Sequence, residues 1–203
     1  MCGIVGIYLK TKKFEKNLGE MLSGMLNNME SRGPDSAGFA IYKNEGNKTY
    51  KFSLCINDLN FNIFKKELSK KIKKIKLKQI SDHVILKTEE KPKKVISVIS
   101  SYFPDVSIVG YGKSIEIFKQ VGNPKDVVKK FKLGEFSGTH GIGHTRMATE
   151  SAITTDGSHP YSTGEDECLV HNGSLSNHNN LRRELTKKGN IFNSENDTEV
   201  AAG

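Results

Sequence analysis

Residues 2–9 read CGIVGIYL and stand directly after Met1. This apolar run, interrupted by two glycines, is typical of a buried strand. A helix is predicted after this strand. It ends at Gly33 and Pro34, because proline removes a backbone donor and glycine is a weak helix former. The runs AGFAIYK (37–43) and TYKFSLCI (49–56) then predict two strands, so the chain opens with a strand, a helix and two strands. The apolar residues at helical spacing that predict this helix are Leu18, Met21, Leu22, Met25, Leu26 and Met29.

The composition changes between about residue 57 and residue 135. A lysine-rich stretch with apolar residues at helical spacing comes first, and strand-like and helix-like segments follow it. The predicted elements are a strand at 83–89, a helix from Pro92, strands at 106–112 and 114–120, and a helix from Asn123. We interpret residues 57–135 as a small α+β insertion within one domain, because 203 residues are near the upper size of a single domain.

The segment from Gly138 onwards returns to a glycine-punctuated pattern. A short strand is predicted at 141–144 and another at 167–170, with a polar loop between them. A helix is predicted over 177–188, with Ser176 or Asn177 as its N-cap and Gly189 at its end. The whole chain is therefore expected to have an α+β fold.

The formal net charge of +8 is concentrated in residues 65–94, which hold twelve lysines against four acidic residues. This stretch lacks arginine and interleaved aromatic residues, so we expect a solvated or partner-docking face there and no nucleic-acid site. No apolar run approaches the length of a membrane span, and the N-terminus lacks the basic region and the long apolar stretch of a secretory signal. The sequence predicts a cytoplasmic protein that does not contact a membrane.

The cysteine and histidine spacing gives no metal motif. The three cysteines are an odd number without CxxC spacing, which predicts neither a disulfide framework nor a zinc site. His140 and His144 have the spacing of a helical zinc pair, but Gly141 and Gly143 disfavour a helix there. The sequence also lacks a phosphate-binding glycine loop, a flavin motif and an iron–sulfur cysteine set, so no metal and no cofactor are expected.

Cys2 is the residue that removal of Met1 would leave at the N-terminus, where one residue would carry both a thiol and an α-amine. The α-amine titrates at about 7.7–8.0, so part of it is neutral near neutral pH. It can then take the thiol proton directly or through water. Taken alone, Cys2 is better explained as a small buried strand residue, so the functional hypothesis depends on the segments that accompany it.

Six short segments stand in a fixed order along the chain: MCGIVG, SRGPDSAG, GHTRMATES, HPY, HNGSLSN and NDTE. Together they resemble the class II glutamine amidotransferases, whose nucleophile is an N-terminal cysteine. The resemblance implies a four-layer αββα sandwich, with two antiparallel sheets between helix layers. It also implies that Cys2 attacks the side-chain amide of L-glutamine and forms a thioester, giving glutamate and ammonia.

The resemblance assigns the oxyanion site to Asn172 and Gly173. A side-chain amide beside a glycine N–H would supply two donors to the carbonyl oxygen under attack. Asn-Gly is also the favoured dipeptide of a tight turn, and without the other segments that interpretation would be preferred. The turn and the oxyanion site are compatible with one structure.

The same resemblance assigns the residues that recognise a free amino acid. Arg146, assisted by Thr149, matches the position that binds the α-carboxylate, for which a planar two-pronged donor is suited. Asp197 matches the position that binds the ammonium group, together with the carbonyl of Gly173. Arg32 matches an arginine that organises the surroundings of the nucleophile, although a helix-terminal arginine is often only a solvated cap partner.

The closest branch of the family, by these segments, is the stand-alone amidotransferase subunit of glutamate-synthase-like enzymes. Many members carry Trp and then His-Gly where this chain has Met147, Glu150 and Ser151. A separate synthase that receives the ammonia is the partner implied. Further strands are usual in the family after the NDTE segment, so residues 2–203 are compatible with a C-terminally incomplete domain.

Two other functions remain open from the sequence. The chain would be a catalytically silent regulatory subunit if it only sensed glutamine, but the presence of Cys2, Asn172 and Gly173 argues against this. It would cleave peptides, penicillins or bile salts if it belonged to another N-terminal-nucleophile group, but Arg146 and Asp197 favour a free amino acid. His144 and His171 are alternative bases, although the α-amine makes them unnecessary and structural hydrogen bonds are the expected role.

Overall fold

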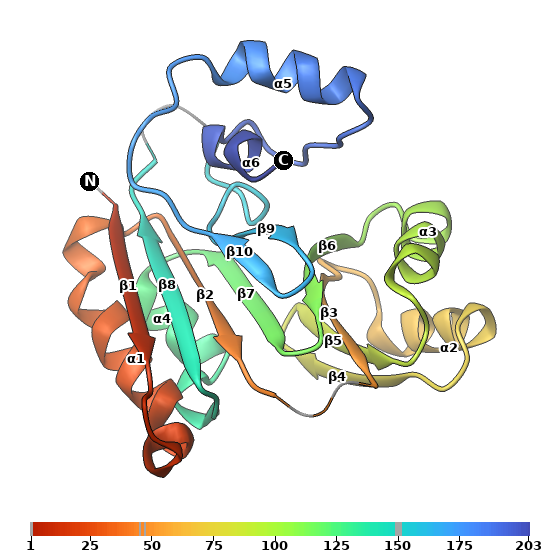
Figure 1. Cartoon of the computed structure of the whole chain (residues 1–203), viewed down its shortest axis with the longest axis horizontal. Helices are drawn as coiled ribbons and strands as arrows, with labels where there is room; N and C mark the ends of the chain where they lie inside the picture. Colours follow the sequence, from red (N-terminus) through yellow and green to blue (C-terminus); the bar gives the residue numbers. More distant parts are fainter. Residues whose placement is uncertain (1, 45, 47, 149–151) are drawn as a thin grey trace.

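The first sheet is antiparallel and is built from segments far apart in the chain. Its strand order is β1-β8-β2-β7, so β1 is followed by a strand that lies more than a hundred residues later. The computed structural model describes residues 2–44, 46, 48–148 and 152–203, and Figure 1 shows their arrangement. The strands are β1 (Gly3–Tyr8), β2 (Ser36–Tyr42), β7 (Ile115–Val121) and β8 (His140–Arg146).

Two helices cover one face of the first sheet. They are α1 (Leu18–Asn28), which follows a short 3-10 turn (Lys12–Asn17), and α4 (Pro124–Lys130). Leu18, Leu22 and Leu26 of α1 are all fully buried, in agreement with the helical spacing of these residues. They pack with Phe39 and Phe118 from β2 and β7, and their burial removes apolar surface from water, the main stabilising contribution to folding.

The second sheet is also antiparallel and has the strand order β4-β5-β3-β6. Two helices, α2 and α3, pack on one of its faces around Phe52, Phe64 and Leu86. The strands are β3 (Tyr50–Cys55), β4 (Lys76–Ile80), β5 (His83–Thr88) and β6 (Ser107–Gly112), and the helices are α2 (Phe61–Lys71) and α3 (Pro92–Tyr102). Strand β4 was not predicted.

The two sheets meet where β7, at the edge of the first sheet, lies beside β3 and β6. The backbone N–H of Ile117 donates to Ser53 Oγ at 2.8 Å, and Lys51 Nζ lies 3.1 Å from Glu116 Oε1. Both contacts join β3 to β7. The second sheet therefore includes β3, which precedes residue 57, while β7 and α4 lie within residues 57–135 but belong to the first sheet and its core.

The last part of the chain packs near the start of β1. It contains a two-stranded antiparallel ribbon and two helices, all drawn in blue in Figure 1. The elements are β9 (Tyr161–Gly164), β10 (Glu167–Leu169), α5 (His178–Lys187) and α6 (Asp197–Ala202). The remaining 3-10 turns are Glu30–Arg32 and Leu133–Glu135.

The α+β class with antiparallel sheets is confirmed. The helix predicted over 177–188 is present as α5, with Asn177 as its N-cap and Gly189 at a positive φ of 97° just after it. No helix among the described residues combines the length and apolar character needed to cross a membrane.

Candidate active site

Cys2 lies immediately before β1 and is half-buried. Its backbone carbonyl accepts two hydrogen bonds, from Asn172 Nδ2 at 3.1 Å and from Arg32 Nε at 3.3 Å. Its Sγ lies 3.8 Å from the carbonyl oxygen of Met147, a weak contact for a thiol. The backbone of Cys2 is thus held by two side chains that are far from it in the sequence.

Arg32 reaches Cys2 because the turn that carries it lies directly on β8. A Cβ at Gly33 would stand 2.3 Å from the carbonyl carbon of Thr145, so only glycine allows this approach. On the other side of the turn, Thr145 Oγ1 donates to the carbonyl of Met29 at 3.2 Å. The SRGPDSAG segment therefore places its arginine through a close backbone contact that the glycine makes possible.

Arg146 is the last residue of β8 and is only 4% exposed. Its Nη1 donates to the carbonyl of Ala152 at 3.2 Å, and its own carbonyl accepts from the N–H of Asp35 at 3.1 Å. The carboxylate of Asp35 in turn accepts from the N–H of Ala148 at 2.8 Å. These bonds fix the end of β8 and hold a buried guanidinium beside Cys2.

The segment after Asn172 is tied to the start of α6. Asp197 Oδ2 accepts a hydrogen bond of 2.6 Å from the N–H of Leu175, and His171 Nδ1 lies 3.3 Å from Thr198 Oγ1. Asn196 caps α6 by accepting from the N–H of Thr198 at 2.9 Å. Because Asp197 occupies the first turn of α6, its carboxylate is held where the helix dipole favours a negative charge.

These elements enclose a pocket of about 120 Å³ beside Cys2. Cys2, Arg146, Gly173 and Asp197 all line it, so four of the predicted site residues meet there. Arg32 and Asn172 contact the Cys2 carbonyl instead. Thr149 lies outside the described residues. The pocket presents a thiol, a guanidinium and a carboxylate, the three chemical groups that the predicted reaction needs.

Several other residues of the wall were not predicted. Of these, His159 stands in the HPY segment and Asn196 and Thr198 in the NDTE segment, so the segments themselves were the available signal. Met147 stands in the GHTRMATES segment, and His171 and Ser174 stand in the HNGSLSN segment, with His171 considered above only as an alternative base. Only His178 and Glu195 lie outside the six segments, and they reach the pocket through the fold of the last part of the chain. The additional lining residues are Met147, His159, His171, Ser174, His178, Glu195, Asn196 and Thr198.

Two buried histidines support the floor of this region. His144 and His159 stack with ring centroids 3.9 Å apart, and His144 Nε2 donates to the carbonyl of His171 at 3.0 Å. Burial lowers the pKa of His144 to about 4 and that of His159 to about 2, and the charge of Arg146 acts in the same direction on both. Both rings are therefore neutral near pH 7, and the hydrogen bond from His144 positions the backbone just before Asn172.

One cluster outside this pocket has metal-ligand chemistry. Donor atoms of Cys55, Asp82 and His83 lie within 4.8 Å of one another. Asp82, however, is already hydrogen-bonded to His83 at 2.9 Å and to Lys130 at 3.1 Å. Burial raises the pKa of the Cys55 thiol to about 11, which opposes the thiolate that a metal ion binds. The cluster is better explained as a hydrogen-bonded part of the core.

Comparison with known proteins gives both local and full-length matches. Residues 134–202 match the family described as a glutamine amidotransferase domain. The glutamine amidotransferase-like protein GlxB of Rhizobium meliloti is 50% identical over 205 residues, covering 100% of this chain and 68% of that protein. A putative glutamine amidotransferase of Methanothermobacter thermautotrophicus is 33% identical over 221 residues, covering 98% of this chain and 70% of that protein. The isomerizing glutamine–fructose-6-phosphate aminotransferase of Methanococcus maripaludis is 43% identical over 88 residues, covering 43% of this chain and 15% of that protein.

Proposed function

The chain belongs to the glutamine amidotransferase family, and on this basis we propose that it hydrolyses the side-chain amide of L-glutamine and passes the ammonia to an acceptor. The observation that carries the proposal is the pocket in which Cys2, Arg146, Gly173 and Asp197 meet. A thiol is a nucleophile for the carboxamide, and a guanidinium with a carboxylate suits the two charged groups of a free amino acid.

The nucleophile of the proposed reaction is the Cys2 thiolate, formed after Met1 has been removed. The α-amine of Cys2 takes the thiol proton, directly or through a water molecule. Support comes from the way Cys2 is held, since Asn172 and Arg32 both donate to its carbonyl oxygen. Neither of these two hydrogen bonds occupies the thiol or the backbone nitrogen of Cys2.

Asn172 and Gly173 stabilise the oxyanion in this proposal. The amide nitrogen of Asn172 carries two hydrogens, and the bond to the Cys2 carbonyl uses one of them. The other, together with the N–H of Gly173, would donate to the oxygen that becomes negative in the tetrahedral intermediate. Donors fixed before the reaction stabilise such a charge without having to reorganise.

The substrate is oriented by opposite charges at its two ends. Arg146, with Thr149, binds the α-carboxylate of glutamine, while Asp197 and the carbonyl of Gly173 bind its ammonium group. Arg32 organises the backbone of the nucleophile. The guanidinium of Arg146 is supported for this role by its burial, because a desolvated arginine interacts more strongly with a carboxylate than an exposed one.

The reaction balances in two steps. The thiolate adds to the carboxamide carbon, the C–N bond breaks, and the nitrogen leaves as ammonia with the proton held by the α-amine. Water then adds to the thioester, the C–S bond breaks, and glutamate leaves with the thiol restored. No cofactor or metal ion is needed for either step.

We also propose a fold and a partner for the chain. The proposed fold is the four-layer αββα sandwich, in which the first sheet with α1 and α4 would form one sheet layer and one helix layer. Residues 2–203 form one domain in this proposal, with an α+β insertion at about residues 57–135. The insertion contributes strands and helices to the second sheet and also carries β7 and α4 of the first sheet. The acceptor is a synthase subunit or domain of the glutamate-synthase-like kind.

The test is to incubate the full chain with a glutamine-mimicking diazoketone and to locate any adduct by mass spectrometry. We expect Met1 to be absent and one adduct to form on Cys2, because the reagent requires both the nucleophile and the substrate pocket. Cys2→Ala should show no adduct and no glutaminase turnover, while Cys168→Ala is the matched control with unchanged labelling.

The alternative is a silent subunit that only senses glutamine. It predicts that glutamine binds, measured by calorimetry, while the wild-type chain neither reacts with the diazoketone nor releases ammonia. A Cys2→Ala variant that kept its glutaminase turnover would contradict the mechanism.

A further inference from the structure

Lys119 is a residue of β7 whose side chain is buried against the segment 152–160, which leads into β9. It is 5% exposed, and its Nζ donates to the carbonyl of Asp156 at 3.0 Å and to that of Ser158 at 2.9 Å. The same Nζ stands 4.4 Å from the centre of the Tyr161 ring, a distance typical of a cation–π contact. One ammonium group thus holds two carbonyls of the segment and the first residue of β9.

The segment 152–160 contacts three neighbouring strands of the first sheet, which Figure 1 shows side by side. In the register of β8, β2 and β7, His144 stands opposite Gly38, and Gly38 stands opposite Lys119. The ring of His159 stacks on that of His144, and a Cβ at Gly38 would stand 2.1 Å from the carbonyl oxygen of His159. Gly38 therefore gives the segment room to lie between the ring of His144 and the ammonium of Lys119.

The segment is linked to the candidate active site at both of its ends. His159 lines the pocket, and His144, on which it stacks, donates to the carbonyl of His171, directly before the proposed oxyanion site. At the start of the segment, the carbonyl of Ala152 accepts from Arg146 Nη1 at 3.2 Å. The position of the segment therefore affects both the guanidinium and the backbone that carries the oxyanion donors.

A buried ammonium is a costly group in a protein core. Burial lowers the pKa of Lys119 to about 8, while the negative charges of Asp156 and Glu199 act in the opposite direction. Both carboxylates also accept other hydrogen bonds, Asp156 from Ser107 Oγ at 3.3 Å and Glu199 from the N–H of Ser194 at 2.8 Å. Apolar residues of similar volume are often equally or more stabilising at such buried sites. The ammonium is therefore best explained by the backbone carbonyls that it holds.

We propose that Lys119 is a positioning residue of the glutamine pocket. Its ammonium fixes the carbonyls of Asp156 and Ser158, and through them it keeps His159 stacked on His144 and in the pocket wall. Lys119 is not among the residues that line the pocket, so it acts only through the segment. The use of this pocket for glutamine rests on the proposed function, whereas the ordering of the segment by Lys119 does not.

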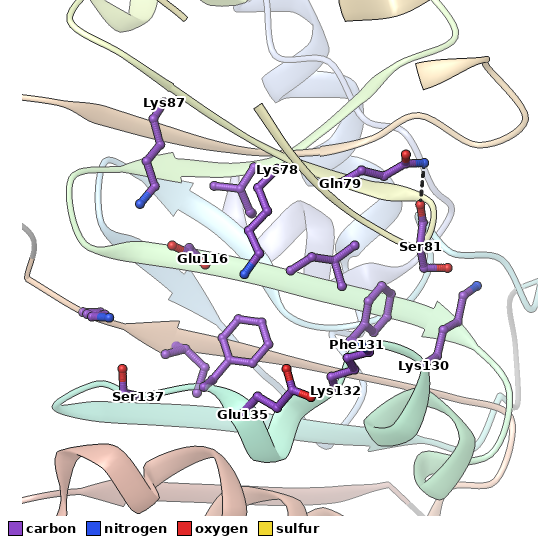
Figure 2. A pocket seen from close by; sticks show the side chains of 15 residues that line it. Lys78, Gln79, Ser81, Lys87, Glu116, Lys130, Phe131, Lys132, Glu135 and Ser137 are labelled. Atoms are coloured by element: carbon purple, nitrogen blue, oxygen red, sulfur yellow. Dashed lines mark hydrogen bonds between the residues drawn. The ribbon is translucent and has the colours of Figure 1, made fainter. Parts of the chain in front are cut away.

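Lys51 offers a matched control, because it is a second buried lysine beside the same strand. It is 1% exposed, and its Nζ lies 3.1 Å from Glu116 Oε1. Glu116 and Lys119 point to opposite faces of β7, since side chains alternate along a strand. Figure 2 shows Glu116 in the wall of a cavity between the two sheets, and this cavity shares no lining residue with the pocket beside Cys2. The variant Lys51→Met therefore removes a buried ammonium on the other side of β7.

The test compares Lys119→Met, Lys119→Arg and Lys51→Met with the wild type, each as the full chain. Methionine is apolar, unbranched and without a donor, whereas arginine keeps the charge and the donors. The cavity of about 240 Å³ that Lys119 lines gives room for the larger guanidinium.

The first readout is the glutamine concentration that half-protects Cys2 from diazoketone labelling, measured by mass spectrometry. It should rise about tenfold in Lys119→Met, because a charge-assisted hydrogen bond contributes about that much to a conformation. Lys119→Arg should restore it to within about threefold of the wild type, since its donors can reach the same carbonyls. Lys51→Met should stay within about twofold, as expected for a site without shared partners.

The second readout is hydrogen exchange of the segment, which does not require glutamine. The N–H of Gly157 donates to Thr154 Oγ1 at 3.0 Å, and the N–H of Ser158 donates to the carbonyl of Thr155 at 3.1 Å. These two amides should exchange at least about tenfold faster in Lys119→Met, because local opening of the segment then costs less free energy. Thermal midpoints are measured in parallel, since a general loss of stability would also increase exchange in the rest of the first sheet.

Three outcomes would overturn the proposal: unchanged glutamine protection in Lys119→Met, an equal loss of protection in Lys51→Met, and unchanged exchange of the segment. If Lys119→Met does not fold, Lys119→Gln, which keeps an amide donor on a shorter side chain, replaces it in both measurements. A wild-type chain whose Cys2 is not labelled by the diazoketone would contradict the proposed glutaminase instead. The exchange measurement would then still decide whether Lys119 holds the segment.

Discussion

Cys2 is held through its backbone and not through its side chain. Asn172 Nδ2 and Arg32 Nε donate to its carbonyl oxygen at 3.1 Å and 3.3 Å, while its Sγ lies 3.8 Å from the carbonyl oxygen of Met147. A nucleophile must be positioned without strong hydrogen bonds to its reacting atom, because such bonds would lower its reactivity. The geometry around Cys2 fits this requirement.

Arg146 provides the first prediction at the scale of single residues. Arg146→Lys should raise the glutamine concentration that half-protects Cys2 from diazoketone labelling by about tenfold or more, because lysine cannot offer two parallel donors to a carboxylate. The protection is measured by mass spectrometry over a series of glutamine concentrations. Arg183→Lys, on the exposed face of α5, is the control and should leave the value unchanged. Equal protection in both variants would remove Arg146 from the proposed binding role.

His159 provides the second prediction, which concerns pH. Burial holds the folded-state pKa of His144 near 4 and of His159 near 2, below the value of about 6.5 in an unfolded chain. As the pH falls below 6.5, the unfolded chain takes up protons first, so the free energy of unfolding should fall by at least about 2 kcal/mol between pH 6.5 and pH 4. Urea denaturation at a series of pH values measures this loss.

The variant His159→Phe tests the assignment. Neither ring nitrogen of His159 has a hydrogen-bond partner within the part of the chain that the structure describes, so phenylalanine loses no bond and keeps a similar shape. The stability of His159→Phe at pH 7 should be close to that of the wild type, and its loss towards pH 4 should be smaller. A pH profile identical to the wild type would show that other groups cause the acid sensitivity.

At the scale of elements, the sequence predicted some strands and helices and missed others. Helix α1 was predicted because three leucines at helical spacing make one buried face. Strand β4 was missed because Ile72 and Ile75 continue the apparent helical pattern of α2 into it. The buried Ile72 is in fact the C-cap of α2, and β4 exposes Lys76, Lys78 and Gln79 while Leu77 and Ile80 are half-buried. Pairing with β5, a tertiary contact, overrides the local preference there.

The N-caps of α2 and α5 give the prediction at this scale. Asn60 accepts hydrogen bonds from the N–H groups of Asn62 at 3.0 Å and Ile63 at 3.2 Å, whereas the side chain of Asn177 makes no cap bond. Asn60→Ala should therefore lower the free energy of unfolding by about 1 kcal/mol. Asn177→Ala, with the same change at an equivalent position, should alter it by less than about 0.5 kcal/mol. Equal losses in urea denaturation would show that the cap bond contributes nothing.

At the scale of the whole molecule, the contacts between the two sheets decide how the halves are joined. Ser53 of β3 accepts from the N–H of Ile117 on the outer edge of β7 at 2.8 Å, and it is 1% exposed. This bond satisfies a donor that the first sheet leaves unpaired at its edge. An unsatisfied backbone N–H at a buried edge would destabilise the fold.

Ser53→Ala is the prediction at this scale. It should lower the free energy of unfolding by about 2 kcal/mol, because the N–H of Ile117 would remain buried without an acceptor. Ser69→Ala is the control, since Ser69 is exposed and its hydroxyl donates to the carbonyl of Lys65 in its own helix, and its effect should stay below about 0.5 kcal/mol. Urea denaturation of the three proteins measures both values, and a loss below 0.5 kcal/mol in Ser53→Ala would contradict the linking role.

The sequence by itself determined the α+β class, the α1 and α5 helices, the strands β1, β2 and β3, and the membership of the glutamine amidotransferase family through short segments in a fixed order. These features depend on local periodicity, turn residues and side-chain chemistry, which a linear sequence displays directly. Only the tertiary structure decided that β7 completes the first sheet, that α4 packs on that sheet, and that β3 joins the second sheet. It also decided that His159, His178 and Glu195 reach the pocket of Cys2. The physical reason is that strand pairing and pocket walls arise from contacts between residues far apart in the chain. The free energy of these contacts cannot be predicted from a local sequence pattern.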